Sequence, residues 1–225
     1  MTQIIIHAGL PKTGTTSIQA MLADEAEALQ KRGVCVVVRG DATRQLRTAG
    51  FSALLRNGGF LGRSYYRRKA RTFWNDVLKS DCRVVLVSDE NLLGIRSRDM
   101  FDPSAKHHAL VVAQQLRESL PEQATLKFVL YERDSEALHR SAWNQRRRKG
   151  SALSYDEWSS QFPDLDEAKR IIESMQDAFG QAVTVVKMED EIANGRFLGE
   201  QVLAAAGVPD HPTPAKVYRE NVGGR

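Results

Sequence analysis

The sequence contains no long hydrophobic run. No apolar stretch in its 225 residues approaches the length of about 18 residues that a membrane-spanning helix needs. The opening MTQIII is also much shorter than a signal peptide. We therefore expect a soluble, cytoplasmic protein without a transmembrane segment. With 42% hydrophobic and 27% charged residues, the chain predicts a single domain over residues 1–225 and leaves little material for a second core.

Cysteine is scarce, since only Cys35 and Cys82 are present. Two cysteines cannot form a metal cluster, and we expect no metal site. Both lie near short β-branched runs that are typical of buried strands. Because free cysteine is among the residues most often buried, we predict two unpaired core thiols instead of a disulfide.

A strong excess of charge is missing as well. The net charge is +4 and the sequence pI is about 9.1, with arginines concentrated at 63–71 and 144–150. These clusters can attract anions, although solvated helix faces would explain them equally well. No zinc finger or aromatic-interleaved RNA motif accompanies them, so nucleic acid is not an expected partner.

What the sequence does contain is a regular alternation of strand and helix patterns. Each Val- and Ile-rich run is short enough for a buried strand, and helical periodicity fills the stretches between the runs. This pattern predicts an α/β fold of three layers, with a central, mostly parallel sheet flanked by helices. Ligands of such sheets bind beyond the carboxyl ends of the strands. The predicted strands are 3–8, 34–38, 83–88, 125–131 and 182–187.

The segment after the first predicted strand, HAGLPKTGTTSIQ, is a candidate anion-binding loop. Gly9 and Gly14 have the spacing of the ATP-binding P-loop, and Thr16 stands where that motif has its magnesium-binding hydroxyl. Thr15, however, occupies the position of the P-loop lysine, and a lysine occurs three residues earlier as Lys12. The helix that begins near Thr15 would present unpaired N–H groups to an anion.

This loop resembles the 5′-phosphosulfate loop of sulfotransferases that use 3′-phosphoadenosine 5′-phosphosulfate (PAPS), and the wider motif is similar to bacterial carbohydrate-type members. The resemblance implies a P-loop-type fold, PAPS as donor, 3′,5′-diphosphoadenosine (PAP) as product and no required metal. It places Lys12 on the bridging oxygen between phosphate and sulfate. It assigns donor binding to Pro11, Lys12, Thr13, Gly14, Thr15, Thr16 and Ser17.

A second motif of the family has a counterpart after the strand at 125–131. Arg133 follows that strand, Ser141 comes eight residues later on the predicted helix, and Trp143 is close behind. This resembles the family's 3′-phosphate motif, which implies that Arg133 and Ser141 bind that phosphate. A guanidinium and a hydroxyl suit a phosphate monoester. Taken alone, the pair is better explained by a solvated helix face, because Arg and Ser at a given spacing are common.

A third strand end supplies a candidate base. The segment Ser88-Asp89-Glu90 resembles the S-x-E of carbohydrate-type sulfotransferases, in which the glutamate takes the proton of the acceptor hydroxyl; Glu90 matches that position. Alternatively, these carboxylates simply cap a helical turn. Other branches of the family use a histidine, but we expect His107 and His108 to be surface residues at a helix start.

The resemblance is thin beyond residue 150. Ser17 replaces the tryptophan that stacks on adenine in many animal cytosolic members, and the tail KVYRENVGGR lacks their R-K-G-x-x-G segment. The roles of Arg219 and Arg225 stay open, as does the oligomeric state. The S-x-E resemblance implies a hydroxyl of a carbohydrate or glycolipid as acceptor, and a lipid or small-molecule alcohol is the alternative. Two alternatives are a P-loop kinase, for which Asp89 is the only attractive magnesium ligand, and a catalytically silent nucleotide-binding protein.

Overall fold

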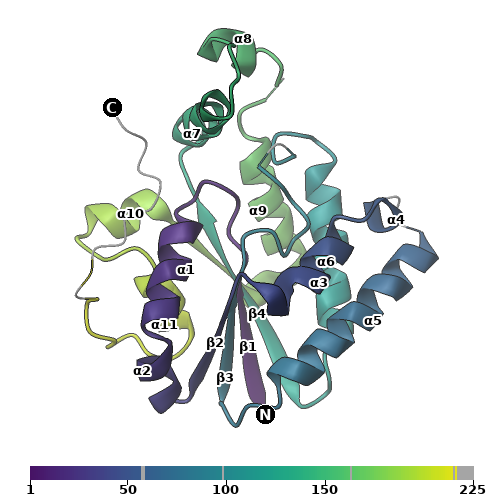
Figure 1. Cartoon of the computed structure of the whole chain (residues 1–225), viewed down its shortest axis with the longest axis vertical. Coiled ribbons are helices and arrows are strands. Elements are labelled where there is room, and N and C mark those ends of the chain that lie inside the picture. The colour runs from purple at the N-terminus through teal and green to yellow at the C-terminus, as the bar shows by residue number, and fades with distance from the viewer. Residues whose placement is uncertain (57–58, 98, 163, 215, 217–225) are drawn as a thin grey trace.

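The computed structural model describes residues 1–56, 59–97, 99–162, 164–214 and 216. Its centre is a five-stranded sheet in the order β2-β3-β1-β4-β5, with every neighbouring pair parallel. Helices cover both faces of the sheet (Figure 1), which confirms the predicted α/β class. The strands are β1 (Thr2–His7), β2 (Val34–Val38), β3 (Val84–Ser88), β4 (Ala124–Glu132) and β5 (Val183–Lys187).

The central strand β1 shows why the sheet is buried on both faces. Ile4 and Ile6 pack into one hydrophobic cluster, while Ile5 between them packs into the other, and all three side chains are fully buried. Successive side chains of a strand point to opposite faces, so an unbroken isoleucine run needs a helical layer on each side. The two clusters supply those layers.

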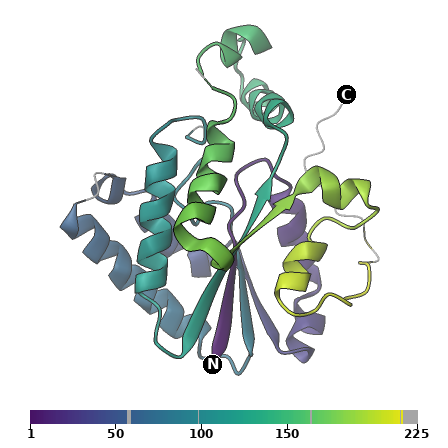
Figure 2. The same cartoon turned by 180° about the vertical axis from the view of Figure 1, so that it is seen from behind.

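One layer packs mainly α3, α5, α6 and α9 against the sheet, and the other packs α1, α2 and α11. Figures 1 and 2 show these two groups from opposite sides, with α7 and α8 projecting beyond the carboxyl end of the sheet. The helices are α1 (Thr15–Asp24), α2 (Ala26–Lys31), α3 (Asp41–Gly50), α4 (Ala53–Arg56), α5 (Phe60–Val77), α6 (Ala105–Glu118), α7 (Ser135–Arg148), α8 (Tyr155–Ser159), α9 (Glu167–Phe179), α10 (Met188–Ala193) and α11 (Glu200–Ala205), with a 3₁₀ turn at Gly180–Ala182.

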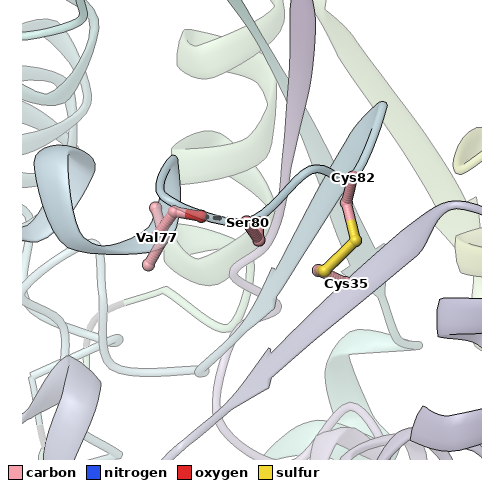
Figure 3. Close-up of a disulfide and its surroundings, with 4 residues drawn as sticks. All are labelled: Cys35, Val77, Ser80 and Cys82. Atoms are coloured by element: carbon pink, nitrogen blue, oxygen red, sulfur yellow. Dashed lines mark hydrogen bonds between the residues drawn. A yellow bond between two sulfur atoms is a disulfide. The ribbon is translucent and has the colours of Figure 1, made fainter.

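The two cysteines form a disulfide, so the prediction of free thiols was wrong. Cys35 lies in edge strand β2 and Cys82 just before β3, and their Cα atoms are 5.7 Å apart (Figure 3). β2 pairs with β3 in parallel from Val34↔Val84 onward, which brings the amino ends of these strands together. The bond therefore ties an edge strand to its neighbour at the end of the sheet opposite the candidate loop.

The prediction that His107 and His108 are both surface residues was half wrong. His107 is exposed, but His108 is buried, and its Nε2 lies 2.8 Å from the carbonyl oxygen of Gly50. Burial is the main cause of the lowered pKa of His108. The side chain is thus a neutral packing element between α6 and the end of α3.

None of the helices in the described ranges is long and apolar enough to cross a membrane. The tail residues Arg219 and Arg225, whose role the sequence leaves open, lie outside the described residues.

Candidate functional site

The loop between β1 and α1 is shaped by two glycines that could not carry a side chain. Gly14 caps α1 with φ +80°, and an added Cβ would lie 2.4 Å from Cδ2 of Leu198. At Gly9, a Cβ would lie 2.8 Å from Cγ2 of Thr15 and 3.0 Å from Oγ1 of Thr13. The 2.4 Å and 2.8 Å separations are shorter than real Cβ contacts allow, and the 3.0 Å separation is tight. The glycine spacing seen in the sequence therefore reflects a tightly folded loop.

Lys12 has an unusual backbone conformation in this loop. Its φ of +77° is the only positive value among the non-glycine residues that the structure describes. Such a conformation is unfavourable for a lysine and persists only where surrounding contacts enforce it, which is common at functional sites. One enforcing contact is visible, because Arg133 Nη1 donates to the carbonyl oxygen of Lys12 at 2.9 Å.

The remaining loop residues divide into a packed set and an open set. Pro11, Thr13, Thr15 and Ser17 are buried, and Thr13 Oγ1 donates to the carbonyl oxygen of Leu10 at 2.7 Å. Thr16 is exposed, and no side chain of the described residues caps the start of α1. The first-turn N–H groups of a helix have no intrahelical partner, so those of Thr15 and Thr16 are available to an anion.

Positive charge converges on Lys12 from several elements. Its pKa is lowered by partial burial first, then by repulsion from Arg148, Lys149 and Arg133, with Glu90 acting in the opposite direction. Arg133 follows β4, while Arg148 and Lys149 stand at the far end of α7. Cations that lower the pKa of Lys12 by repulsion make the site favourable for a ligand that brings negative charge.

Helix α7 passes over the carboxyl end of the sheet. It begins directly after Arg133, beside the loop, and Ser97 Oγ donates to Oε1 of Gln145 near its end at 3.1 Å. Ser97 lies in the segment after β3, and β3 and β4 flank β1 on opposite sides. The last turn of α7 is thereby placed near the segment that carries Glu90.

The neighbouring carboxylates Asp89 and Glu90 differ in surroundings. Asp89 is fully buried, and its two oxygens accept from Thr43 Oγ1 at 2.7 Å, Arg47 Nη1 at 2.5 Å and the Asn91 backbone N–H at 3.0 Å. These bonds fix α3 to the end of β3. A carboxylate so fully engaged is poorly placed to bind a metal ion, as a kinase would require of it.

Glu90, in contrast, is partly open to solvent, with 11% of its side chain exposed. Oε2 accepts from Gln19 Nε2 of α1 at 2.7 Å, and Oε1 accepts from Arg39 and from Asn91 Nδ2. Gln19 joins Glu90 to the helix that begins at the loop. The structure thus brings Glu90, Lys12 and Arg133 to one end of the sheet.

Ser141 stands apart from this group. It is half-buried in the middle of α7, about 9 Å of helix rise beyond Ser135, the first residue of that helix. No hydrogen bond joins Ser141 to Arg133 among the described residues, since Arg133 precedes α7 and Ser141 lies in the middle of that helix.

Several residues of the site have no counterpart in the sequence reasoning. His7 at the end of β1 is fully buried; its Nδ1 lies 2.7 Å from Ser88 Oγ, whereas Nε2 has no partner among the described residues. Burial lowers the pKa of His7 to about 3, so the ring is neutral. Arg39 was missed too, although its position after the strand 34–38 was a usable signal.

Leu198 was also missed, and it lies far from the loop in sequence. The segment around it is held by the buried carboxylate of Glu191, which accepts from Tyr131 Oη at 2.9 Å and from the backbone N–H of Gly199 at 3.0 Å. A Cβ added at Gly14 would meet Leu198, and one added at Gly199 would meet Met21 and Ile18 of α1, so this segment packs against Gly14 and α1. No local pattern around residue 198 could have indicated that role.

Among the described residues, no cluster of three or more His, Cys, Asp or Glu side chains is placed to hold a metal ion. The sequence matches no known protein-family model and no curated protein. The fold is similar to the crystal structure of a sulfotransferase from Alicyclobacillus acidocaldarius, with a TM-score of 0.50 and 14% identity, over 98% of this chain and 85% of that chain. At this identity the likeness extends to the fold: a parallel α/β sheet flanked by helices, arranged as in a sulfotransferase.

Proposed function

We propose that the protein transfers a sulfuryl group from PAPS to a hydroxyl group, in a carbohydrate or glycolipid acceptor. The observation that carries the proposal is the placement of Lys12. Its backbone has a left-handed conformation, and it lies between Gly9 and Gly14, where a side chain would clash. Arg133, Arg148 and Lys149 lower its pKa by repulsion, and Glu90 is close enough to raise it. The sulfotransferase-like fold supports the same reading.

The donor suits the charges of the site. PAPS carries phosphate groups at both ends of its ribose, and the loop offers Lys12 together with the N–H groups that open α1. Arg133 retains a buried Nε without a partner among the described residues, as expected of a side chain that awaits an anion. We assign Arg133 and Ser141 to the 3′-phosphate, and Pro11, Thr13, Gly14, Thr15, Thr16 and Ser17 with Lys12 to the 5′-phosphosulfate.

In the transfer step, Glu90 accepts the proton of the acceptor hydroxyl as its oxygen bonds to sulfur. The bond between sulfur and the bridging oxygen breaks, and Lys12 stabilises the negative charge that remains on the departing phosphate oxygen. Glu90 currently accepts from Arg39, which is partly exposed. Arg39 must therefore yield one carboxylate oxygen when an acceptor enters, and it can do so because its other surroundings are open to water.

The kinase alternative is weaker on this structure. It needs a lysine at position 15, which is Thr15, and a free strand-end carboxylate, whereas Asp89 is held by Arg47 and Thr43. A catalytically silent nucleotide-binding protein would share the binding site. It would not, however, need a carboxylate such as Glu90 held beside the loop by the hydrogen bond from Gln19 of α1.

A thermal-shift experiment separates these functions. PAP without metal should raise the melting temperature, by the equivalent of about 2.7 kcal/mol when present at about 100 times its dissociation constant. The matched ligand is 5′-AMP, which lacks the 3′-phosphate and should give a smaller shift. Stabilisation by magnesium-ATP alone would refute the proposal in favour of a kinase. Normal PAP binding without sulfate transfer across a panel of sugar and glycolipid hydroxyls would favour the silent protein.

A further inference from the structure

Helix α5 carries an exposed stripe that no part of the proposed reaction uses. Phe60, Ser64, Arg67, Arg68 and Arg71 recur at helical spacing and together line a shallow depression of about 340 Å³. The opposite face of the helix, with Tyr66, Ala70 and Trp74, is fully buried in the core. The helix is thus fixed with this stripe directed outward.

The stripe is strongly basic. Residues 60–75 contain Arg63, Arg67, Arg68, Lys69 and Arg71, and no acidic residue. Two of these cations already have partners: Arg67 bonds to Gln115 and pairs with Glu118, and Lys69 donates to Gln45. Arg68 lies over the ring of Tyr65 at 5.9 Å, and neither it nor Arg71 has a carboxylate partner in the described part of the chain. These two guanidinium groups are available to an external anion.

Large apolar side chains stand at the amino end of the same stripe. Phe60 is 82% exposed and Leu61 is 74% exposed, next to Tyr65 at 37%. This end of α5 lies at an outer corner of the molecule beside α4 (Figure 1). Exposed apolar side chains on a protruding corner, next to Arg68 and Arg71, which have no carboxylate partner among the described residues, form a surface that can make both apolar and ionic contacts.

We propose that this surface, defined by Phe60, Leu61, Ser64, Arg68 and Arg71, docks the protein on an anionic lipid membrane. Phe60 and Leu61 would enter the interfacial region, and Arg68 and Arg71 would bind lipid phosphate and carboxylate groups. A soluble polyanion such as a nucleic acid or sulfated glycan would engage the arginines but leave the two apolar side chains in water. The apolar pair is therefore what favours a membrane, and the proposal is independent of the sulfotransferase assignment.

Vesicle co-sedimentation with the full chain tests this directly. Wild-type protein should sediment with phosphatidylcholine vesicles that contain about one-third phosphatidylserine, and much less with pure phosphatidylcholine. Arg68→Gln/Arg71→Gln should weaken partitioning about 25-fold, at about fivefold for each juxtamembrane charge. Phe60→Ser/Leu61→Ser, which keeps every charge, should also weaken it by tenfold or more, because apolar burial is lost.

The control is Lys31→Gln/Lys79→Gln, which removes two exposed charges outside this surface and should leave partitioning within about twofold of wild type. Failure of the wild type to bind anionic vesicles would overturn the proposal. So would equal losses in the control and the arginine variant, which would show a non-specific charge effect. Unchanged binding by Phe60→Ser/Leu61→Ser, together with tight binding to heparin, would assign the surface to a soluble polyanion instead.

Discussion

The two ends of the parallel sheet have opposite character. At the amino end, the disulfide between Cys35 and Cys82 joins β2 to the segment before β3. At the carboxyl end, Lys12 and Arg133 gather positive charge, and buried nitrogens of His7 and Arg133 lack partners among the described residues. The cross-link is thus separated from the candidate site by the length of the sheet. Changes at one end should alter stability, and changes at the other should alter function.

The largest effect is expected at Lys12. Lys12→Met should reduce sulfate transfer on the order of 10³-fold, because the side chain would stabilise charge that develops only as the donor bond breaks. Binding of PAP should fall much less, since the helix N–H groups still hold the phosphate. Transfer of labelled sulfate and PAP titration measure the two quantities. Equal losses in both would reduce Lys12 to a binding residue.

The opposite end should respond with a loss of stability alone. Cys35→Ser/Cys82→Ser should lower the free energy of unfolding by about 3 kcal/mol, because a cross-link with a sequence separation of 47 restricts the unfolded chain. Denaturant unfolding under non-reducing conditions measures this. PAP affinity should stay within a factor of about two of wild type. A large loss of PAP affinity in the folded variant would mean that the two ends are coupled.

The next largest effect is expected from Glu90→Gln. The substitution preserves the shape of the side chain but removes the proton acceptor, so transfer should fall by about 10²-fold with little change in PAP binding. Asp89→Asn is the informative comparison, because it weakens the bond to Arg47 and should reduce melting temperature instead. Near-normal transfer by Glu90→Gln would move the proton acceptor to another residue.

Ser141→Ala offers the cleaner test of 3′-phosphate recognition. Arg133→Ala would also free the carbonyl of Lys12, so its effect mixes loop structure with ligand binding. Loss of the Ser141 hydroxyl should narrow the preference for PAP over 5′-AMP by roughly tenfold, as one hydrogen bond to a charged group is worth about 1.5 kcal/mol. Competition titrations give the ratio. If the ratio is unchanged, Ser141 does not contact the 3′-phosphate.

The smallest effect concerns pH. Burial and then Arg148 lower the pKa of Lys12, so removing Arg148 should raise that pKa. Lys12 would then keep its proton to higher pH, and the alkaline limb of kcat/KM in Arg148→Gln should move upward. Arg140→Gln, on the same helix near its partner Glu136, serves as the control and should not move that limb. If the alkaline limb of kcat/KM moved equally in both variants, the cause would be the change in net charge of the protein and not the proximity of Arg148 to Lys12.

The strands were the most predictable elements. Val and Ile runs buried on both faces are conspicuous in a sequence, and all five predicted strands exist with ends that differ by one residue or less. The stretch between 39 and 82 gave no such signal, and its three helices α3, α4 and α5 were not predicted as separate elements. The disulfide was missed because it depends on β2 and β3 being sheet neighbours, which is a property of topology.

The candidate site was predictable only as a set of residue types after strand ends. The glycine spacing around Lys12 could be read because it is local. The bond from Arg133 to the Lys12 carbonyl, and the hold of Arg39 on Glu90, join residues far apart in the chain. Such contacts depend on side-chain directions that no sequence pattern specifies. The sequence therefore predicted Arg133 and Glu90 as ligand-binding residues, but it could not predict the hydrogen bonds that they make within the protein.

The contact of Leu198 with Gly14 has a consequence for biosynthesis. The loop is synthesised long before the segment around Leu198, which lies between α10 and α11. Until that segment is synthesised, Gly14 lacks its apolar contact with Leu198. Contacts between distant parts of a chain also form slowly, because long loops must close first. The fully packed loop should therefore appear late during translation, and nascent chains stalled before residue 198 should have a loop without this contact.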